Sequence, residues 1–248
     1  MQKKTFNMSV YENQAVLNAY EMLTTNIYIS RKQKMVKSIV LTSCNPQEGK
    51  TTIATSLAII LAHSGWQVLL VDANMRSFSA AKRLNNRSFA GLSDYMRNMR
   101  NFSAVKRLNN RSFAGLSDYL TKAVQLEEAL SETNITNLTY LACGSDFSNP
   151  IGLLYSARFE ELMKKVRSEY DFVIFDTPAL ASVNDGLLVA SRADAAVLVV
   201  KMGRTRLTSI ARRKEQLEQL DIKFLGILLN QVKKHDYEKY FEYYNYYH

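Results

Sequence analysis

Six short runs of consecutive apolar residues are spaced along the chain. Each is four to seven residues long and rich in Val, Ile and Leu, without the regular apolar–polar alternation of a half-solvated sheet. Strands that are buried on both faces of a parallel sheet have this composition. We therefore predict strands at residues 38–43, 67–71, 138–142, 172–175, 195–201 and 224–229.

Helical periodicity fills the intervals between these runs. Apolar residues recur at spacings of three and four in residues 51–63, 156–168 and 205–220, and charged residues occupy the other faces of the last two segments. Strands that alternate with helices predict an α/β fold with three layers, in which helices cover both sides of a mostly parallel sheet. Ligands of such sheets bind at the carboxyl ends of the strands, so the residues that follow each strand are the candidates for chemistry.

A phosphate-binding loop is the first candidate. The sequence Cys44-Asn45-Pro46-Gln47-Glu48-Gly49-Lys50-Thr51-Thr52 follows the first predicted strand and runs into a predicted helix. Its end matches the motif G-x-x-x-x-G-K-[ST], although Cys44 stands at the first glycine position. A strand before it and a helix after it would aim backbone N–H groups and a positive helix end at an anion. The alternative is an ordinary strand-to-helix turn with an exposed lysine.

This motif predicts a nucleotide triphosphate site with Mg²⁺. Lys50 would reach the β- and γ-phosphates, and the hydroxyl of Thr51 would complete the Mg²⁺ shell. The predicted nucleotide contacts from this loop are Pro46, Gln47, Glu48, Gly49, Lys50, Thr51 and Thr52.

Two aspartates end buried strands at the same predicted edge. Asp72 follows the sequence Val-Leu-Leu-Val, and Asp176 follows Phe-Val-Ile-Phe. A carboxylate after four apolar residues would be unfavourable inside the core, whereas Mg²⁺ prefers one or two carboxylates together with phosphate oxygens. One such aspartate could be a helix cap, but two beside a phosphate loop favour a nucleotide triphosphate–Mg²⁺ site with metal ligands Thr51, Asp72 and Asp176.

Composition narrows the class of protein. The formal charge is +9, which favours an anionic partner such as a nucleotide, a nucleic acid or an anionic membrane face. Two cysteines are too few for a disulfide framework. The N-terminal residues lack the apolar region of a signal peptide, and the longest apolar stretch, residues 53–62, is too short to span a bilayer. These features predict a soluble cytoplasmic protein.

A tandem duplication supplies part of the basic charge. Residues 74–96 recur as residues 98–120, and the two copies differ only at Ser77/Asn101, Ala81/Val105 and Met96/Leu120. The unit 97–120 contains five basic residues and one acidic residue, a net +4. Two copies are too few for a solenoid, so we interpret the unit as an insertion within residues 73–120. A second basic arm near the active site is the alternative.

Three motifs together resemble the bacterial tyrosine kinases of capsule and exopolysaccharide assembly. They are PQEGKTT, VLLVDANMR and FVIFDTP, which are similar to the Walker A, A′ and B motifs of that family. Similar stretches include AYEMLTTNI, GLSDYL, NPIGLLYSARFEELMKKV and GILLNQ, so the resemblance covers almost the whole chain. It implies a P-loop NTPase fold over one kinase domain, residues 1–236. It also implies use of ATP with Mg²⁺ and catalytic roles for Lys50, Asp72 and Asp176. By similarity to related P-loop ATPases, it implies an adenine contact at Asn230.

The resemblance also implies partners. A separate transmembrane adaptor of the polysaccharide co-polymerase type would activate the kinase and recruit it to the inner face of the membrane. The chain would associate with itself, a cognate phosphotyrosine phosphatase would act on it, and no nucleic acid is expected to bind.

Several positions depart from the family pattern. Gln47 stands where the family usually has glycine, so the backbone of the loop must accommodate a side chain there. Asn74 replaces the second acid of the family's D-x-D, and an amide cannot act as a base. Asn18, Glu21 and Thr24 occupy the family's E-x-x-R-x-x-R oligomerisation positions, so the usual ring-forming ion pairs cannot form.

The C-terminal tail, residues 237–248, is rich in tyrosine. Six of the fourteen tyrosines of the chain lie there, at Tyr237, Tyr240, Tyr243, Tyr244, Tyr246 and Tyr247. Four of them could form one face of a short amphipathic helix, but Tyr243 and Tyr246 fall off that stripe. With the three motifs, the tail is interpreted as a set of phosphoacceptors for autophosphorylation.

Two other functions remain open from the sequence. One is an ATPase switch of the partition and septum-site class without tyrosine kinase activity. Such proteins carry a lysine early in the loop, where Asn45 stands here. The other is a weakened regulatory homologue, which the substitutions Gln47 and Asn74 would favour.

Overall fold

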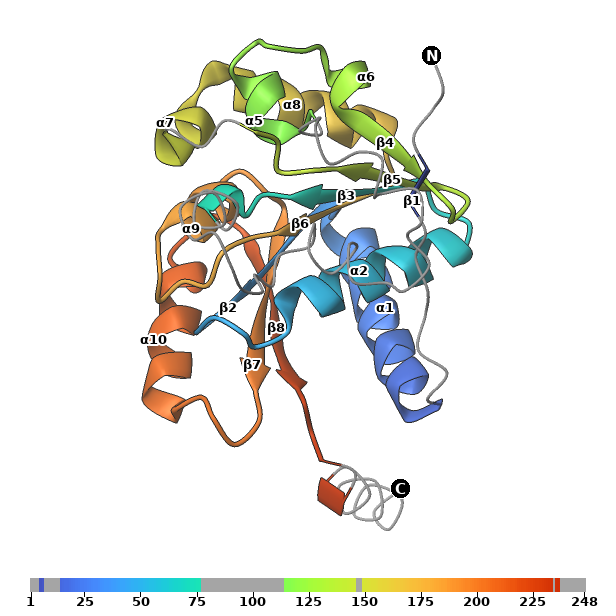
Figure 1. Ribbon diagram of the computed structural model, residues 1–248. Helices are drawn as coiled ribbons and strands as arrows, with labels where there is room; N and C mark the ends of the chain where they lie inside the picture. Colours follow the sequence, from blue (N-terminus) through green and yellow to red (C-terminus); the bar gives the residue numbers. More distant parts are fainter. Residues whose placement is uncertain (1–4, 7–13, 77–113, 146–148, 234, 237–248) are drawn as a thin grey trace, which may run out of the picture.

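The computed structural model describes residues 5–6, 14–76, 114–145, 149–233 and 235–236. The described residues form eight strands that join in one sheet (Figure 1). The strands are β1 (Thr5–Phe6), β2 (Ser38–Ser43), β3 (Val68–Asp72), β4 (Leu130–Thr133), β5 (Leu138–Leu141), β6 (Phe172–Asp176), β7 (Ala195–Lys201) and β8 (Lys223–Asn230).

The sheet is mostly parallel, as predicted. Its order is β1-β4-β5-β3-β6-β2-β7-β8, and the pair β4–β5 alone is antiparallel among the described strands. The strand that leads into the phosphate loop, β2, therefore lies between β6 and β7. All six predicted strands are present with bounds shifted by at most one residue. The strands β1 and β4 were not predicted. β4 reads LSET, which has too few apolar residues to stand out from the sequence.

Helices cover both faces of this sheet. Neighbouring strand residues divide between two hydrophobic clusters: Leu69 and Val71 of β3 belong to one, and Val68 and Leu70 to the other. Because successive side chains of a strand point to opposite faces, these clusters lie on opposite sides of the sheet. The helices are α1 (Gln14–Lys34), α2 (Lys50–His63), α5 (Leu116–Leu120), α6 (Leu126–Ala129), α7 (Pro150–Tyr155), α8 (Ala157–Glu169), α9 (Asp185–Ala190) and α10 (Leu207–Glu218).

Two predicted helix starts are shifted for identifiable reasons. α8 begins one residue later than predicted, because Ser156 is its N-cap and accepts a hydrogen bond from the Phe159 amide through its hydroxyl. α10 begins at Leu207 instead of residue 205, because the Thr205 hydroxyl hydrogen-bonds Glu48 of the phosphate loop. α1 was not predicted, and its inner face contributes Tyr20 and Ile27 to the core.

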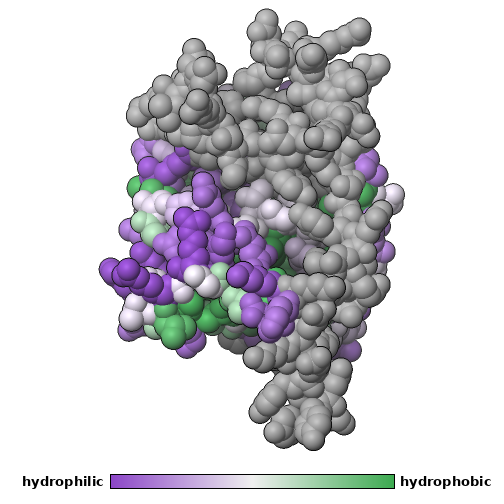
Figure 2. Space-filling view, turned by 60° about the horizontal axis from the view of Figure 1, so that its bottom comes forward, coloured by the Kyte–Doolittle hydropathy of each residue, from purple (hydrophilic) through white to green (hydrophobic). Residues whose placement is uncertain are grey.

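None of the described helices is both long and apolar enough to cross a bilayer. The face of the molecule in Figure 2 carries many hydrophilic residues with a smaller hydrophobic area among them. The duplicated residues 77–113 and the tail tyrosines 237–247 lie outside the described part of the chain.

Candidate functional site

The phosphate loop connects the carboxyl end of β2 to the first residue of α2. Gly49, at the N-cap of α2, has a left-handed backbone with φ 91°. A Cβ there would lie 2.1 Å from the Asn230 side-chain nitrogen, so only glycine fits without displacing that side chain. Lys50 and Thr51 then begin the helix, where free backbone N–H groups point out of its amino end.

Gln47 also has a left-handed backbone, with φ 63°. Residues other than glycine rarely adopt this conformation, and it is strained by about 1–2 kcal/mol. Gln47 stands where the resembling family usually has glycine, and here the loop keeps the backbone conformation of glycine at the cost of strain.

The carboxylate of Glu48 holds the loop together from inside. Its side chain is fully buried and accepts hydrogen bonds from the amide nitrogen and the side-chain amide of Asn45, both at 3.0 Å. The hydroxyl of Thr205, in the segment between β7 and α10, also donates to it. Glu48 was predicted as a nucleotide contact. Its carboxylate instead binds protein groups, which leaves its backbone as the part that could face a ligand.

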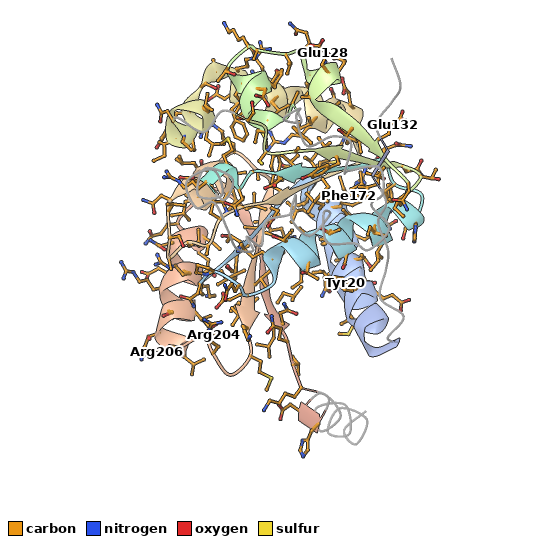
Figure 3. All side chains as sticks on the ribbon, viewed as in Figure 1. Tyr20, Glu128, Glu132, Phe172, Arg204 and Arg206 are labelled. Carbon is orange, nitrogen blue, oxygen red and sulfur yellow. The ribbon has the colours of Figure 1, made fainter. Side chains whose placement is uncertain are left out.

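Asn230 lies against the same loop. Its side-chain nitrogen donates to the Glu48 carbonyl at 2.8 Å. This side chain was predicted to contact adenine, and the structure places it on the phosphate-loop backbone at the end of β8. The segment that contains Thr205 lies on the other side of Glu48, and Figure 3 shows its exposed Arg204 and Arg206 near the start of α10.

The two predicted aspartates are neighbours in the sheet. Asp72 ends β3, Asp176 ends β6, and the two residues are register partners. Both are buried. Asp176 accepts a hydrogen bond from the Thr51 hydroxyl at 2.6 Å, so the start of α2 and the end of β6 are joined directly. The structure thus brings Thr51, Asp72 and Asp176 together at one edge.

Burial dominates the electrostatics of this edge. It raises the pKa of Asp176 to about 6, against the opposing effects of the Lys50 charge and the Thr51 hydrogen bond. Burial also lowers the pKa of Lys50, while Asp176 and Glu48 act in the opposite direction. Lys50 is therefore a buried amine beside the buried carboxylate of Asp176. Its positive charge can bind an anion that enters the site from solvent.

One oxygen of Asp176 fits the predicted metal. Its Oδ1 is buried and has no hydrogen-bond partner among the described residues. An unsatisfied buried carboxylate oxygen is costly unless something binds it. Mg²⁺ prefers hard oxygen ligands and takes one or two carboxylates with phosphate oxygens, so this carboxylate, Asp72 and the Thr51 hydroxyl form a donor set of the required kind.

Asn74 follows Asp72 closely, at the position of the missing second acid. Its backbone amide donates to Oδ1 of Asp72 at 3.0 Å. This bond turns the backbone after β3 and fixes one oxygen of the Asp72 carboxylate. The site therefore has two carboxylates and one amide side chain at this edge, where a D-x-D sequence would supply three carboxylates.

A contact that the sequence did not predict fixes the segment after Asp72. Arg76 donates to both carboxylate oxygens of Asp185, at 2.6 and 3.1 Å. Asp185 is fully buried at the start of α9. Both residues follow the predicted aspartates along the chain, but charged residues in loops are common, and only the fold shows that these two meet.

Comparison with known proteins agrees with this geometry. The AAA domain family matches residues 36–222. The tyrosine-protein kinase CpsD of Streptococcus agalactiae is 34% identical over 87% of this chain and 83% of its own length. The tyrosine-protein kinase YwqD of Bacillus subtilis is 32% identical over 89% of this chain and 83% of its own length.

A solved structure shares the fold. The kinase domain of the Escherichia coli tyrosine kinase ETK superimposes with a TM-score of 0.73 at 25% sequence identity, over 88% of this chain and 76% of that one. The three-layer α/β fold of the P-loop NTPase type, expected from the strand–helix alternation and the family resemblance, is thereby confirmed.

Proposed function

This chain belongs to the bacterial tyrosine-protein kinases, and from that premise we propose that it transfers the γ-phosphate of ATP to the tyrosines of its own C-terminal tail. The transfer takes place in trans, between neighbouring copies of the chain. Through it the protein regulates the synthesis of capsular or exopolysaccharide, and other proteins serve as further substrates.

The observation that carries this proposal is the meeting of Lys50, Thr51, Asp72 and Asp176 at the carboxyl edge of β2, β3 and β6. The amino end of α2 and Lys50 bind the phosphates of ATP. Thr51, Asp72 and Asp176 hold Mg²⁺, which neutralises charge on the transferred phosphoryl group when bound. Asp72 or Asp176, both at this edge, accepts the phenol proton of an incoming tyrosine.

The position of β8 supports the tail as the substrate, and the mixing experiment below decides between the site of the same chain and that of a neighbouring copy. The strand ends at Asn230, whose side chain hydrogen-bonds the phosphate loop at Glu48. The chain therefore leaves the sheet at the nucleotide site, and few residues separate Asn230 from Tyr237. The acceptors proposed are Tyr237, Tyr240, Tyr243, Tyr244, Tyr246 and Tyr247. Each phosphate would add a charge of roughly −1.5 to −2, so that phosphorylated tails repel one another.

The proposed partners follow from the family. A transmembrane adaptor of the polysaccharide co-polymerase type recruits the chain to the inner face of the membrane and activates it. It raises the local concentration of kinases, so that tails and sites of different copies meet. The chain forms homo-oligomers without the usual ring-forming ion pairs, and a phosphotyrosine phosphatase reverses the reaction.

Purified protein with Mg-ATP and the cytoplasmic segment of the adaptor tests the activity, with phosphotyrosine as the readout. We expect phosphotyrosine on the tail, and its loss in Lys50→Met. The matched control is Lys164→Met, because Lys164 is an exposed lysine of α8 far along the chain from the phosphate loop. ATP hydrolysis without phosphotyrosine would instead identify an ATPase switch and overturn the proposal.

Transfer in trans needs its own experiment. Lys50→Met protein with intact tail tyrosines is mixed with active protein whose six tail tyrosines are replaced by phenylalanine. Phosphate on the inactive chain supports transfer between copies. Phosphotyrosine on the unmodified protein, together with none on the inactive chain of the mixture, would show transfer within one chain.

A further inference from the structure

Residues 115–120, the docking segment, bind at the carboxyl end of β5. The Leu116 amide donates to the Ala142 carbonyl at 2.7 Å, and the Ser117 amide donates to the Cys143 carbonyl at 3.0 Å. The carboxylate of Asp118 accepts hydrogen bonds from the Ser145 amide, at 3.0 Å, and from the Ser145 hydroxyl. Residues 142–145, the acceptor strip, thus bind both the backbone and a side chain of the docking segment.

The fit is selective at the first residue of the docking segment. A Cβ on Gly115 would lie 2.3 Å from the Ala142 carbonyl oxygen, and the backbone φ of Gly115 is extended, so only the steric approach requires glycine here. On the acceptor side, a Cβ on Gly144 would lie 2.6 Å from Oδ2 of Asp118. The two backbones therefore approach more closely than any side chain allows.

Apolar contacts and one arginine complete the site. Leu116, Tyr119 and Leu120 are buried in the hydrophobic cluster on this side of the sheet. Arg158 of α8 donates to the Tyr119 carbonyl at 2.6 Å, and its guanidinium lies 4.2 Å from the centre of the Tyr119 ring. Backbone, charge and shape together make residues 142–145 and Arg158 a binding site for the sequence Gly-Leu-Ser-Asp-Tyr.

The chain contains this sequence twice. Residues 91–96 repeat residues 115–120 with the single difference of Met96 for Leu120. We propose that the acceptor strip has two ligands in the same chain, and that residues 91–96 occupy it whenever residues 115–120 do not. One site holds one copy at a time. A Leu-to-Met exchange conserves volume and is among the best tolerated in a core, so the difference between the copies does not exclude the first.

The residues that follow each copy favour different copies. The Thr121 hydroxyl contacts the Ser117 and Asp118 carbonyls, and the first copy has Arg97 in that place. The next residue acts in the opposite direction. Lys122 has a left-handed backbone with φ 65°, and the first copy offers Asn98, which tolerates that conformation better. Binding of the first copy and binding of the second copy therefore differ by a few local contacts and not by the whole site.

Chain length permits the exchange. With the first copy bound, residues 77–90 must connect Arg76 to the acceptor strip, and an extended stretch of that length reaches up to roughly 45 Å. Residues 97–120 are then released, and they lengthen the loop between the bound copy and α6. Moving residues from one loop to another changes the closure entropy slowly, as the logarithm of loop length.

The choice of bound copy decides to which segment of the chain the duplicated basic unit belongs. When the second copy is bound, residues 97–114 of the duplicated unit belong to the segment that follows Asp72 and Arg76. With the first copy bound, it belongs to the segment before α6, away from that connection. The basic residues that change segment are Arg97, Arg100, Lys106, Arg107 and Arg111.

Valine at the glycine position tests the proposal, because it excludes a copy sterically. In Gly115→Val the second copy cannot bind, and we expect hydrogen-exchange protection to appear at residues 92–96 while the thermal midpoint falls by only a few degrees. The matched control Gly91→Val should behave as the unaltered protein. The double variant should lose protection in both copies and lose at least about 5 °C more than Gly115→Val.

A variant that contains only one copy provides the second measurement. Deletion of residues 97–120 leaves the first copy alone before Thr121, and there Gly91→Val should lower the midpoint as far as the double variant does. The proposal is overturned if Gly115→Val alone falls as far as the double variant, or if residues 92–96 exchange no more slowly in it than in the unaltered protein. Dimers that form in Gly115→Val but not in the unaltered protein would also overturn it, because the first copy would then bind between chains.

Discussion

Arg76 and Asp185 form a bidentate ion pair between the segment after β3 and the first turn of α9. The carboxylate of Asp185 is 1% exposed, whereas Arg76 is 37% exposed, so the acid depends on the pair more than the base does. The pair fixes the chain just beyond Asp72 to the helix that follows the Asp176 strand. It therefore joins the segments that follow the two strand-end aspartates, outside the sheet.

Arg76→Ala should lower the free energy of unfolding by about 2 kcal/mol, because it leaves a buried carboxylate without its donor. Asp185→Asn in the same chain should recover part of that loss, since an amide is less costly to bury unpaired than a charge. Denaturant unfolding of the two single variants and the double variant measures the coupling. Additive losses would show that the two side chains do not stabilise each other.

Asp176→Asn should raise the free energy of unfolding of the nucleotide-free protein by about 1–2 kcal/mol, because it removes a buried charge with one oxygen that has no hydrogen-bond partner in the described part of the chain. The Thr51 hydroxyl can still donate to the amide oxygen. The same variant should lose the stabilisation that Mg-ADP gives the unaltered protein. Thermal melts with and without Mg-ADP separate the two effects, and a variant that is less stable without nucleotide would contradict the cost assigned to the buried Asp176 oxygen.

Gln47→Gly should stabilise the protein, or leave its stability unchanged, because glycine relieves about 1 kcal/mol of left-handed strain at φ 63°. The matched control is Gln219→Gly. Gln219 is also exposed, but its φ is −74°, so glycine there should destabilise through added freedom of the unfolded chain. Equal losses in the two variants would mean that the phosphate loop does not hold Gln47 under strain.

Cys44 should make stability fall at high pH. Burial, together with the nearby Glu48 charge, raises the pKa of this thiol from its ordinary 9.0 to about 11, against the effect of Arg213. Between about pH 9 and pH 11 the thiol ionises in the unfolded chain but not in the folded one, so ionisation favours unfolding there. The stability of the unaltered protein relative to Cys44→Ser should therefore be constant below pH 9 and decrease above it. A constant difference up to pH 11 would show that Cys44 ionises equally in both states.

Asn74→Asp should increase the rate of tyrosine phosphorylation, because it restores the second carboxylate of the D-x-D pattern beside Asp72. The rate is measured at several Mg²⁺ concentrations, so that a gain in metal affinity is distinguished from a gain in turnover. Gln219→Glu, which adds the same charge at an exposed position outside the phosphate loop, is the control and should not increase it. A slower Asn74→Asp enzyme would show that the site is adapted to the amide.

The sequence by itself determined six of the eight described strands and the chemistry at their ends. Those features are local, since a run of apolar residues reports its own burial, and the phosphate loop and the two aspartates follow their strands directly. Sequence could not supply the strand order, the weakly apolar β4, or the pairing of Arg76 with Asp185 and of Thr205 with Glu48. These depend on residues that are far apart in the chain and are brought together only by packing.

The duplication separates most clearly what the sequence determines from what the tertiary structure decides. The two copies have the same Gly-Leu-Ser-Asp-Tyr sequence, so no local pattern can state which of them binds the acceptor strip. The tertiary structure placed residues 115–120 there, next to Thr121 and the turn into α6. The choice rests on the neighbours that the rest of the fold provides, because two identical segments differ in free energy only through what surrounds them.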